Sequence, residues 1–563
     1  MKDLNDKATG STLTASEFNE IPSEIQQAIT DSGQTLSSGD LTQLSKATSA
    51  NVANKAAAVL LTPINNKSYF IGGSDGGWFK GVTGGSGYAD NGGSYCGTQF
   101  IPTGGDGSAA WVRVYDDSIN IVWFGAIAGA DSTTAIKNTV SAAIANTKIK
   151  IPSASSSYLM NEKLSVNVRG IVFDGDTPEG SVIEFNNSLD AGIEFSTDDS
   201  NYTDYTGTAA DYGFNNIRIK GPGKATSTTG IMDWENGGAL LSNVIISHFG
   251  TGFEGVSGDV CEWIKVSIHN CTDAGFIAGP SDQFTMVAPY IFSNTRGLTL
   301  EYPKAVEMIS PKFVFNTDSD LIISTPDAPK YAGYSSNNSH VIIRNPWLES
   351  SANKSNFFHI GKSANTISAQ GVVISDPIII TSHTITAFCE IDGATDVKII
   401  RPNIANQTTG TITNLILNNT FGSVIKHVEL IEPRGKLTAV TNLVGGADKK
   451  VSIIYSKDGI SDVQGVEYDG IGYRFKPDSS GAVIDIQSLN SGTWATILTL
   501  DGGNKEIKIP TGGYTLKTAS SLWSNEPFAL GNYYLWVDAT GDLRIKSGAP
   551  TSDTDGTVVG TQT

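Results

Sequence analysis

The chain has little charge, no long apolar run and a shortage of basic residues. Only 17% of its 563 residues are charged, and 57 Asp and Glu outnumber 38 Lys and Arg, for a formal net charge of −19. Because such a surface repels phosphate backbones, we expect no nucleic-acid partner. No segment approaches the ~18 continuous apolar residues of a transmembrane helix, so we expect no membrane insertion.

Cysteines and catalytic signatures are also scarce. Four cysteines (Cys96, Cys261, Cys271 and Cys389) are too few and too scattered for a disulfide framework or a zinc site. We interpret them as small buried hydrophobes from a reducing compartment. The first residues, 1–6, contain no apolar signal region, so no secretory signal peptide is expected.

The sequence also lacks a nucleophile elbow, a phosphate loop and an HExxH zinc signature, and we expect no cofactor. The acidic turn Asp174-Gly175-Asp176 could touch a cation. A lone acidic turn is usually only a turn, so we expect no metal.

What the chain has instead is a repeat. Seven times between residues 217 and 433 it places two apolar residues two positions apart and a proline three positions after the second. The seven copies begin at Ile217, Phe284, Val306, Val341, Val372, Val397 and Val428. A period of about 20 to 35 residues built on period-2 strands indicates a solenoid. Alternation turns the apolar pair inward, and proline ends each strand at a corner.

A second motif, glycine followed by an apolar residue, sets the register. It occurs at Gly230, Gly252, Gly275 and Gly297, in steps of 22, 23 and 22 residues, with Gly192 as an earlier copy. We expect these glycines to turn the backbone with φ > 0 and the next residue to begin an inward-facing strand. Helical repeats are excluded by the spacing of two and by the many β-branched, Asn, Ser and Gly residues. The predicted fold is therefore all-β, a parallel β-helix.

The pattern divides the chain into four predicted parts. Residues 1–61 carry two capped helices, starting near Ser16 and Ser38, and a short apolar run. Residues 62–148 form a Gly-rich domain of strands, one of them spanning 120–125, and a helix at 133–145 that caps the solenoid. Residues 149–449 are the β-helix. Residues 450–563 read as antiparallel hairpins, with Asp-Gly-Gly-Asn at 501–504 as a turn signal, and we predict a C-terminal β-sandwich.

This layout resembles bacteriophage tailspike proteins, the receptor-binding polysaccharide depolymerases. Three segments carry the resemblance. Residues 7–14 with 32–41 are similar to particle-anchoring regions of tail fibres and spikes. Residues 124–126, the following helix and 149–152 are similar to the start of a pectate-lyase-like right-handed β-helix, although the usual Gly-Asp-Gly-x-x-Asp-Thr run is altered at 129–134. Residues 534–546 resemble C-terminal ends shared by many phage tail proteins.

The resemblance implies a homotrimer that binds a bacterial surface polysaccharide. It also implies attachment to other phage tail or baseplate proteins through the N-terminus, and trimerisation or glycan binding through the C-terminal part. Such a protein would belong to the virion tail, assemble in the host cytoplasm and act at the host cell surface.

Candidate catalytic residues follow from the predicted register. Glycoside hydrolysis needs two carboxylates about 5 to 10 Å apart, and neighbouring rungs of a β-helix stack ~4.8 Å apart. The glycine-apolar motif places Ile231, Phe253, Phe276 and Leu298 inside the coil. Their successors Met232, Glu254, Ile277 and Thr299 would point out, as would Trp234, Val256, Gly279 and Glu301 two positions later. Glu194 would share the column of Glu254, and Glu235, Asp259, Glu262, Asp273 and Asp282 would lie at adjacent corners.

We therefore predict Glu254 as catalytic, with Glu235, Asp259 or Glu301 as its partner. For substrate binding we predict Trp234, Trp263, Arg296, Trp347, Tyr331 and Tyr334, because aromatic faces stack on sugars and Arg296 could hold an acidic sugar. Glu307 and Glu349 beside Trp347 form a second candidate patch. The competing interpretation is that outward Glu residues are only solvated surface, that Trp263 belongs to the core, and that His248 and His269 are structural.

The predicted activity is endo-acting glycoside hydrolysis of host capsule or O-antigen. Polysaccharide lyase chemistry is an enzymatic alternative that needs a uronic acid and a base such as His or Lys. A spike that binds its receptor without cleaving it is an alternative from another class. A secreted pectinase-like enzyme fits less well, because the sequence shows no signal peptide and its ends resemble those of phage proteins.

Overall fold

The computed structural model describes residues 51–195, 212–233, 239–256, 260–278, 283–324, 340–361, 369–392 and 394–406. Beyond these it describes strands between 411 and 530 and most of 532–561. The chain divides into two compact units, Met1–Pro222 with Leu240–Ile245, and Gly223–Ala239 with Ile246–Thr563. The predicted helices near Ser16 and Ser38 lie outside the described residues.

The first unit contains a small mixed sheet followed by parallel coils. The mixed sheet has the order β1 (Asn51–Val52), β2 (Ser68–Ile71), β3 (Gly77–Thr83), β5 (Ala109–Arg113) and β4 (Gln99–Phe100). Helix α4 (Lys55–Ala58) precedes β2. Ile71, Phe79, Phe100 and Trp111 are almost fully buried and form its core. Alternating apolar residues on β2 and β3 therefore build a separate apolar cluster before the solenoid begins.

The segment between this sheet and the coils differs in part from the prediction. Strand β6 (Ser118–Asn120) ends early, and residues Ile121–Phe124 form the 3-10 helix η2 instead of a strand. The Asn120 side chain accepts a hydrogen bond from Val122 N, and Gly125 ends the helix with φ 95°. An N-cap and a left-handed C-cap thus override the β-branched residues between them. The predicted helix at 133–145 is confirmed as α5 (Thr133–Ala142).

The first coils follow directly. Parallel ladders join β7 (Lys148–Ile151), β10 (Val172–Gly175) and β13 (Tyr212–Asn215); β8 (Tyr158–Met160), β11 (Val182–Phe185) and β14 (Arg218–Lys220); and β9 (Leu164–Val166) with β12 (Ala191–Phe195). Strand β16 (Ala239–Ser242) also belongs here.

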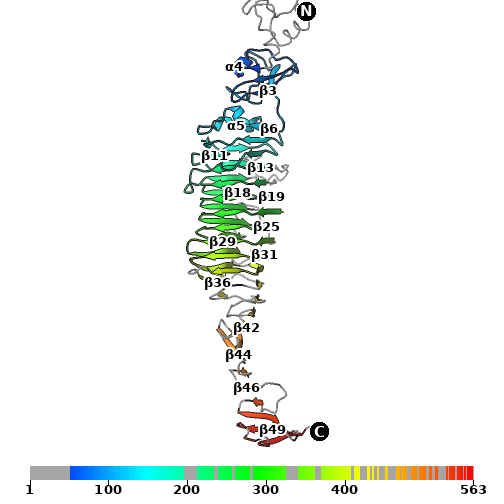
Figure 1. Cartoon of the computed structure of the whole chain (residues 1–563), viewed down its shortest axis with the longest axis vertical. Coiled ribbons are helices and arrows are strands. Elements are labelled where there is room, and N and C mark those ends of the chain that lie inside the picture. Colours follow the sequence, from blue (N-terminus) through cyan, green and yellow to red (C-terminus); the bar gives the residue numbers. More distant parts are fainter. Residues whose placement is uncertain are drawn as a thin grey trace, which may run out of the picture. The chain divides into compact units, whose positions relative to one another are not determined.

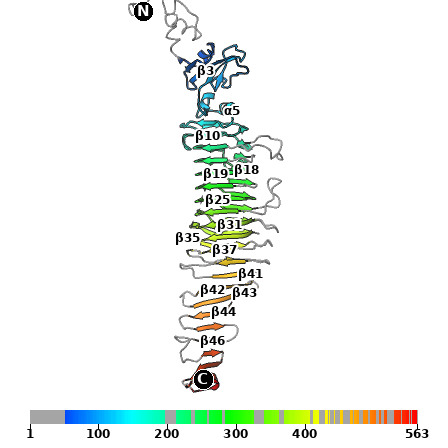
Figure 2. The ribbon, with the colours of Figure 1, turned by 90° about the vertical axis from the view of Figure 1, so that its right-hand side faces the viewer.

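In the second unit each coil contributes one strand to each of three parallel sheets, which stack rung upon rung (Figures 1 and 2). The β18 sheet contains β15 (Thr229–Asp233), β18 (Thr251–Val256), β21 (Asp273–Ala278), β24 (Arg296–Glu301), β27 (Leu321–Ser324), β30 (Lys354–Gly361), β33 (Thr384–Asp392), β36 (Thr411–Asn418) and β39 (Thr441–Asn442).

The β19 sheet contains β19 (Val260–Ile264), β22 (Gln283–Val287), β25 (Ala305–Ile309), β28 (His340–Arg344), β31 (Ala369–Ser375), β34 (Ala394–Ile400), β37 (Val428–Ile431) and β40 (Lys450–Ile453). The β20 sheet contains β17 (Ile245–Ser247), β20 (Ser267–His269), β23 (Tyr290–Phe292), β26 (Lys312–Val314), β29 (Trp347–Ser350), β32 (Ile378–Thr381), β35 (Asn403–Asn406) and β38 (Arg434–Gly435). The predicted parallel β-helix is confirmed.

The repeat explains the core and the corners. Phe284 aligns with Val306 on the next rung, Met286 aligns with Met308, and all four are buried. The corner between the β19 and β20 sheets is a single left-handed residue, such as Ala288 with φ 50°. Such a residue stands just before each of the repeat prolines from 289 to 402. Proline therefore follows a left-handed corner residue and directly precedes the next strand, instead of ending the strand before the corner as predicted.

The glycines of the glycine-apolar motif have a different role from the one predicted. Among the described residues, none of Gly230, Gly252, Gly275 and Gly297 has a positive φ. Instead, a Cβ on Gly297 would lie 1.8 Å from Asp320 O, and one on Gly252 would lie 2.5 Å from Ala274 O. These positions need glycine because adjacent rungs approach too closely for a side chain.

The last parallel strand, β40, leads into an antiparallel meander. It runs through β41 (Gln464–Tyr468), β42 (Ile471–Pro477), β43 (Val483–Asn490), β44 (Thr493–Asp501), β45 (Glu506–Ile509) and β46 (Tyr514–Lys517). A four-stranded antiparallel sheet follows, with β47 (Phe528–Leu530), β48 (Tyr533–Val537), β49 (Asp542–Ser547) and β50 (Thr557–Thr561). The predicted hairpins are confirmed, including the β44–β45 pair around residues 501–504, while their packing as a sandwich stays a prediction.

Candidate functional site

The outward face of the β18 sheet carries the predicted acidic residues, in a register that corrects the prediction at one rung. Glu254 aligns with Met232 on one side and with Phe276 on the other. Phe276 was predicted to point inward, but Gly275 occupies the position level with Phe253 and Leu298. Ile277, predicted to point out, is therefore buried. The glycine-apolar motif is shifted by one residue relative to the ladder register here. A shift of one residue moves every side chain of a strand to the opposite face of the sheet.

Glu254 lies on this outward face and is nevertheless only 4% exposed. The Thr229 hydroxyl donates a hydrogen bond of 3.3 Å to its Oε2. Because a desolvated carboxylate is costly unless it is hydrogen-bonded, its burial is not the solvated-surface arrangement of the competing interpretation. Glu254 is thus an enclosed carboxylate and not a solvated one.

Glu301 has a similar environment at the end of β24. It is 5% exposed and aligns with Ala278 and Ser324 on neighbouring rungs. It lies two rungs and two residues from Glu254, which at ~4.8 Å per rung and ~3.3 Å per residue separates the two Cα atoms by about 12 Å. The structure therefore places two buried carboxylates on one face of one sheet.

A third acidic group on this face was missed by sequence reasoning. Glu390 continues the ladder column of Thr299, through Ile322 and His359. Its Oε2 accepts a 2.6 Å hydrogen bond from Asn356 Nδ2 and lies 3.8 Å from His359 Nδ1. Asn356 is in turn held by Ser319, whose hydroxyl donates 2.6 Å to its Oδ1. A buried carboxylate and a half-buried imidazole thus stand together on the outward side of the sheet, on a buried polar support.

The signal for this pair was present but not usable. Phe358-His359-Ile360 and Cys389-Glu390-Ile391 each place one polar residue between two buried ones. Alternation alone predicts that such a residue points outward. The last copy of the glycine-apolar motif that gave the register is at Gly297. The register of the later rungs, which carry His359 and Glu390, could therefore not be predicted.

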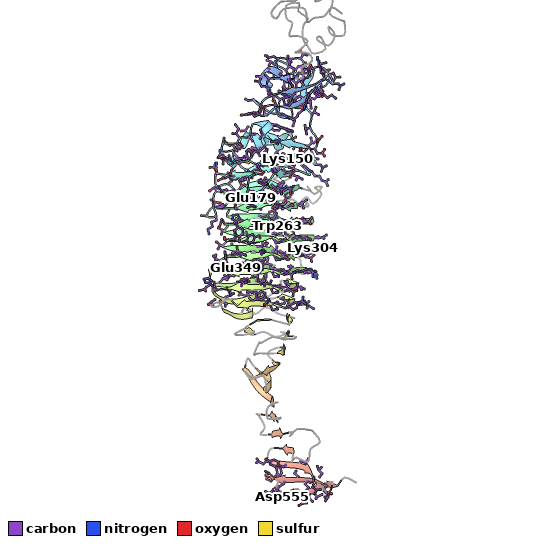
Figure 3. The ribbon with its side chains drawn as sticks, viewed as in Figure 1. Lys150, Glu179, Trp263, Lys304, Glu349 and Asp555 are labelled. Atoms are coloured by element: carbon purple, nitrogen blue, oxygen red, sulfur yellow. The ribbon has the colours of Figure 1, made fainter. Side chains whose placement is uncertain are left out.

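Two predicted substrate-binding residues have other roles. Trp263 is fully buried, with its ring edge-to-face between Phe253 and Phe284, and lies within the stack of coils (Figure 3). The prediction that it binds substrate is wrong, because alternation places it on the inward side of β19. Arg296 is exposed, but Asp273 binds its guanidinium through two hydrogen bonds of 2.6 and 2.8 Å and raises its pKa.

Other predicted acidic residues are dispersed. Glu194 aligns with Ser165 and forms an ion pair of 2.6 Å with Lys163. Glu262 is exposed on the outer face of the β19 sheet, away from Glu254. Glu307 bonds Arg344 on the same sheet at 2.7 Å. Glu262 and Glu307 therefore lie on a different sheet from the enclosed pair.

The remaining predicted residues fall into two groups. Trp347 is half-buried on the β20 sheet, where its indole Nε1 donates 3.4 Å to Glu349 Oε2. Figure 3 shows Glu349 on the opposite side of the stack from Lys304. The predicted catalytic residues Glu235 and Asp259, and the predicted aromatic residues Trp234, Tyr331 and Tyr334, lie outside the described residues, as does Asp282.

The acidic turn at 174–176 has structural partners. Asp174 pairs with Lys150, and Asp176 accepts a 2.8 Å hydrogen bond from Ser153 N. Within the described part of the chain, no three His, Cys, Asp or Glu side chains gather as metal ligands would. The described helices are also too short or too polar to cross a membrane.

Comparison with solved structures finds phage tailspikes and an α-1,3-glucanase. Full-length tailspike protein 2 of the Escherichia coli O157:H7 bacteriophage CAB120 is 13% identical, over 89% of this chain and 77% of that chain, with a TM-score of 0.42. A tailspike of an Acinetobacter phage is 13% identical over 84% and 96%, with a TM-score of 0.39. The catalytic unit of an α-1,3-glucanase from Streptomyces thermodiastaticus is 12% identical over 63% and 73%, with a TM-score of 0.36.

No curated protein sequence matches the chain. A family model does match at the C-terminal end, over residues 517–561, which span strands β47 to β50. That model describes capsule depolymerases, and the match supports the resemblance to phage tailspike depolymerases that the sequence itself predicted.

Proposed function

We propose that the chain is a phage tailspike that binds and depolymerises a host surface polysaccharide by endo-glycosidic hydrolysis, with Glu254 and Glu301 as the carboxylate pair. The observation that carries this proposal is the near-complete burial of both carboxylates on the outward face of one sheet. Surface carboxylates that serve only solubility are not enclosed in this way. The capsule depolymerase match at residues 517–561 supports the substrate class.

The spacing favours one stereochemical course. Inverting glycosidases hold their carboxyl groups roughly 6.5 to 9.5 Å apart, to leave room for water, whereas retaining enzymes hold them roughly 5 to 5.5 Å apart. With Cα atoms about 12 Å apart, an estimate from rung and residue spacings, the two carboxyl groups reach the wider arrangement when their side chains lean toward each other, and they lie further from the narrower one. In the proposed reaction one carboxylic acid protonates the leaving oxygen. The other carboxylate removes a proton from the water that attacks the opposite face of the sugar.

Lyase chemistry is the second candidate, and the His359–Glu390 pair is the observation that favours it. β-Elimination from a uronic acid needs a base, and a surface imidazole 3.8 Å from a carboxylate can supply one. The carboxylate would orient the ring and stabilise the imidazolium formed when His359 accepts the proton.

The proposal extends to assembly. Residues 1–61 would attach to other tail or baseplate proteins, and the chain would form a homotrimer that is assembled in the host cytoplasm and acts at the host surface from the virion tail. The outer face of the β19 sheet supports the trimer, because Ile264, Val287 and Ile309 share one outward column and are only half-buried. An apolar stripe of this kind along a sheet is suited to burial against another copy.

The test is incubation of the purified chain with capsule and O-antigen polysaccharides from candidate hosts, followed by mass spectrometry of the products. We expect saturated oligosaccharides of one repeat length. Glu254→Gln and Glu301→Gln should each lower the rate at least about 100-fold while the polymer still binds, because general acid and base groups contribute roughly 10² to 10⁴ each.

Matched controls separate the candidate functions. Glu262→Gln removes an exposed carboxylate of the neighbouring sheet and should retain full activity. Products that carry an unsaturated end, together with loss of activity in His359→Ala, would identify a lyase and reject the carboxylate pair. Tight binding without products on a panel that contains the host polysaccharide would establish a spike that does not cleave.

A further inference from the structure

The outer face of the β20 sheet carries two aromatic residues at one ladder position. Tyr290 aligns with Lys312 on the next rung, and Lys312 aligns with Trp347 on the rung after that. At ~4.8 Å per rung, the two aromatic residues stand about 10 Å apart along the solenoid axis. This spacing is roughly the length of a disaccharide in an extended glycan.

Neighbouring side chains hold both rings in place. Tyr290 is 38% exposed, and its ring stacks on Phe292 at a centroid distance of 4.4 Å. Phe292 stacks in turn on His269 at 4.5 Å. The second ring, Trp347, donates its indole N–H to Glu349. Fixed rings lose little conformational entropy when a ligand stacks on them, which is the property of a preorganised platform.

Lys312 supplies a charge between the two rings. It is exposed, and across the described residues it takes part in no ion pair. Glu349, on the same strand as Trp347, accepts a hydrogen bond from the Trp347 indole. An ammonium group between two stacking positions is therefore placed to meet an anionic substituent on the sugar chain.

We propose that Tyr290, Lys312 and Trp347 form a second glycan site, a non-cleaving platform for an acidic polysaccharide chain on the β20 sheet. The sugars stack on Tyr290 and Trp347, and a carboxylate of the chain pairs with Lys312. The inference rests on the proposed function, since it gives the same polymer a second contact on a different sheet from Glu254 and Glu301. A tether of this kind keeps the polymer at a high local concentration near the cleaving face.

The experiment measures polymer binding by the full chain in native gels that contain one of two classes of purified capsular polysaccharide, acidic or neutral. Tyr290→Ala and Trp347→Ala should each weaken binding to the acidic polymer by roughly fivefold. Lys312→Gln should weaken binding to the acidic polymer more at low salt than at high salt. Lys312→Arg keeps the positive charge and should bind the polymer as the unchanged chain does. Trp78→Ala removes an exposed aromatic residue far along the chain and serves as the control.

Kinetics separate the two proposals. Loss of the platform should raise the KM for long polymer and leave kcat unchanged, because the reacting groups lie on another sheet. Unchanged affinity in Tyr290→Ala and Trp347→Ala would overturn the platform while leaving the cleavage proposal standing. A change in molecular mass in these variants would identify the face as an interface between copies and overturn the platform. A chain that neither binds nor cleaves any polysaccharide would overturn both.

Discussion

At the scale of single residues, the core of the second unit contains an unusual charge pair. Lys354 Nζ lies 2.6 Å from Asp320 Oδ2, and both side chains are fully buried. Asn316 donates a 2.9 Å hydrogen bond to Asp320 Oδ1, and the Lys354 ammonium lies 4.1 Å from the centroid of the Phe357 ring. Burial raises the pKa of Asp320 and lowers that of Lys354, because desolvation disfavours both charged forms.

Removing one member of this pair should be more damaging than removing both. Lys354→Met leaves the buried Asp320 carboxylate without its cationic partner and should destabilise the folded chain by about 3 to 5 kcal/mol. The double variant Asp320→Leu with Lys354→Met should recover much of that loss. The measurement is the urea midpoint of each variant, and a double variant no more stable than Lys354→Met would contradict the expectation.

Backbone demands at the corners give a second test at this scale. Gly297→Ala would place a Cβ 1.8 Å from Asp320 O, so it should destabilise the coil by several kcal/mol or prevent folding. Ala288→Gly relieves a left-handed φ of 50° and should be neutral or stabilising by up to about 1 kcal/mol.

Thermal denaturation of both variants, beside Gly560→Ala as a control where a Cβ finds room at 3.7 Å, checks these opposite signs. Equal effects at positions 288 and 297 would show that conformation, and not contact between rungs, determines where glycine is needed.

At the scale of elements, the turn between β48 and β49 depends on Asp538. Its Oδ1 accepts hydrogen bonds from the backbone and hydroxyl of Thr540 and from Asp542 N, and its Oδ2 pairs with Arg544. The Thr540 hydroxyl first, and Arg544 next, lower the pKa of this carboxyl. This turn lies within the residues that match the capsule depolymerase model.

The C-terminal sheet should therefore be acid-sensitive. Because the folded-state pKa is lowered, this stabilisation is complete above the unfolded value of about 3.9 and is lost as the pH falls below it. Proteolysis or melting of the four-stranded sheet at pH 7 and pH 3 measures the loss. Asp538→Asn should be less stable at pH 7 and lose less on acidification, and a variant with the parent's pH dependence would assign the sensitivity elsewhere.

At the scale of the whole molecule, the proposed trimer makes a direct prediction. Light scattering on the purified chain should give three times the 59.4 kDa of one copy. Ile309→Lys and Val287→Lys place charges in the apolar stripe of the β19 sheet and should lower the mass to that of one copy. Lys265→Glu changes an exposed residue beside the stripe and is the control. A parent chain with the mass of one copy would reject the trimer.

What the sequence by itself determined is the repeating part of this protein. Period-2 apolar pairs such as Phe284 and Met286, and the prolines after them, specify inward-facing strands and corners, because both depend only on neighbours in the chain. The parallel β-helix, the helix at α5, the antiparallel C-terminal strands and the outward position of Glu254 follow from these local rules.

Only the tertiary structure decided which residues meet across rungs. The slip at Phe276, the contact that makes Gly297 necessary and the enclosure of Glu254 and Glu301 depend on atoms from other coils. The pairing of His359 with Glu390 joins residues one coil apart, and no local pattern gives the length of that coil. Register between coils is set by packing and ladder hydrogen bonds, which the order of residues along a single strand does not encode.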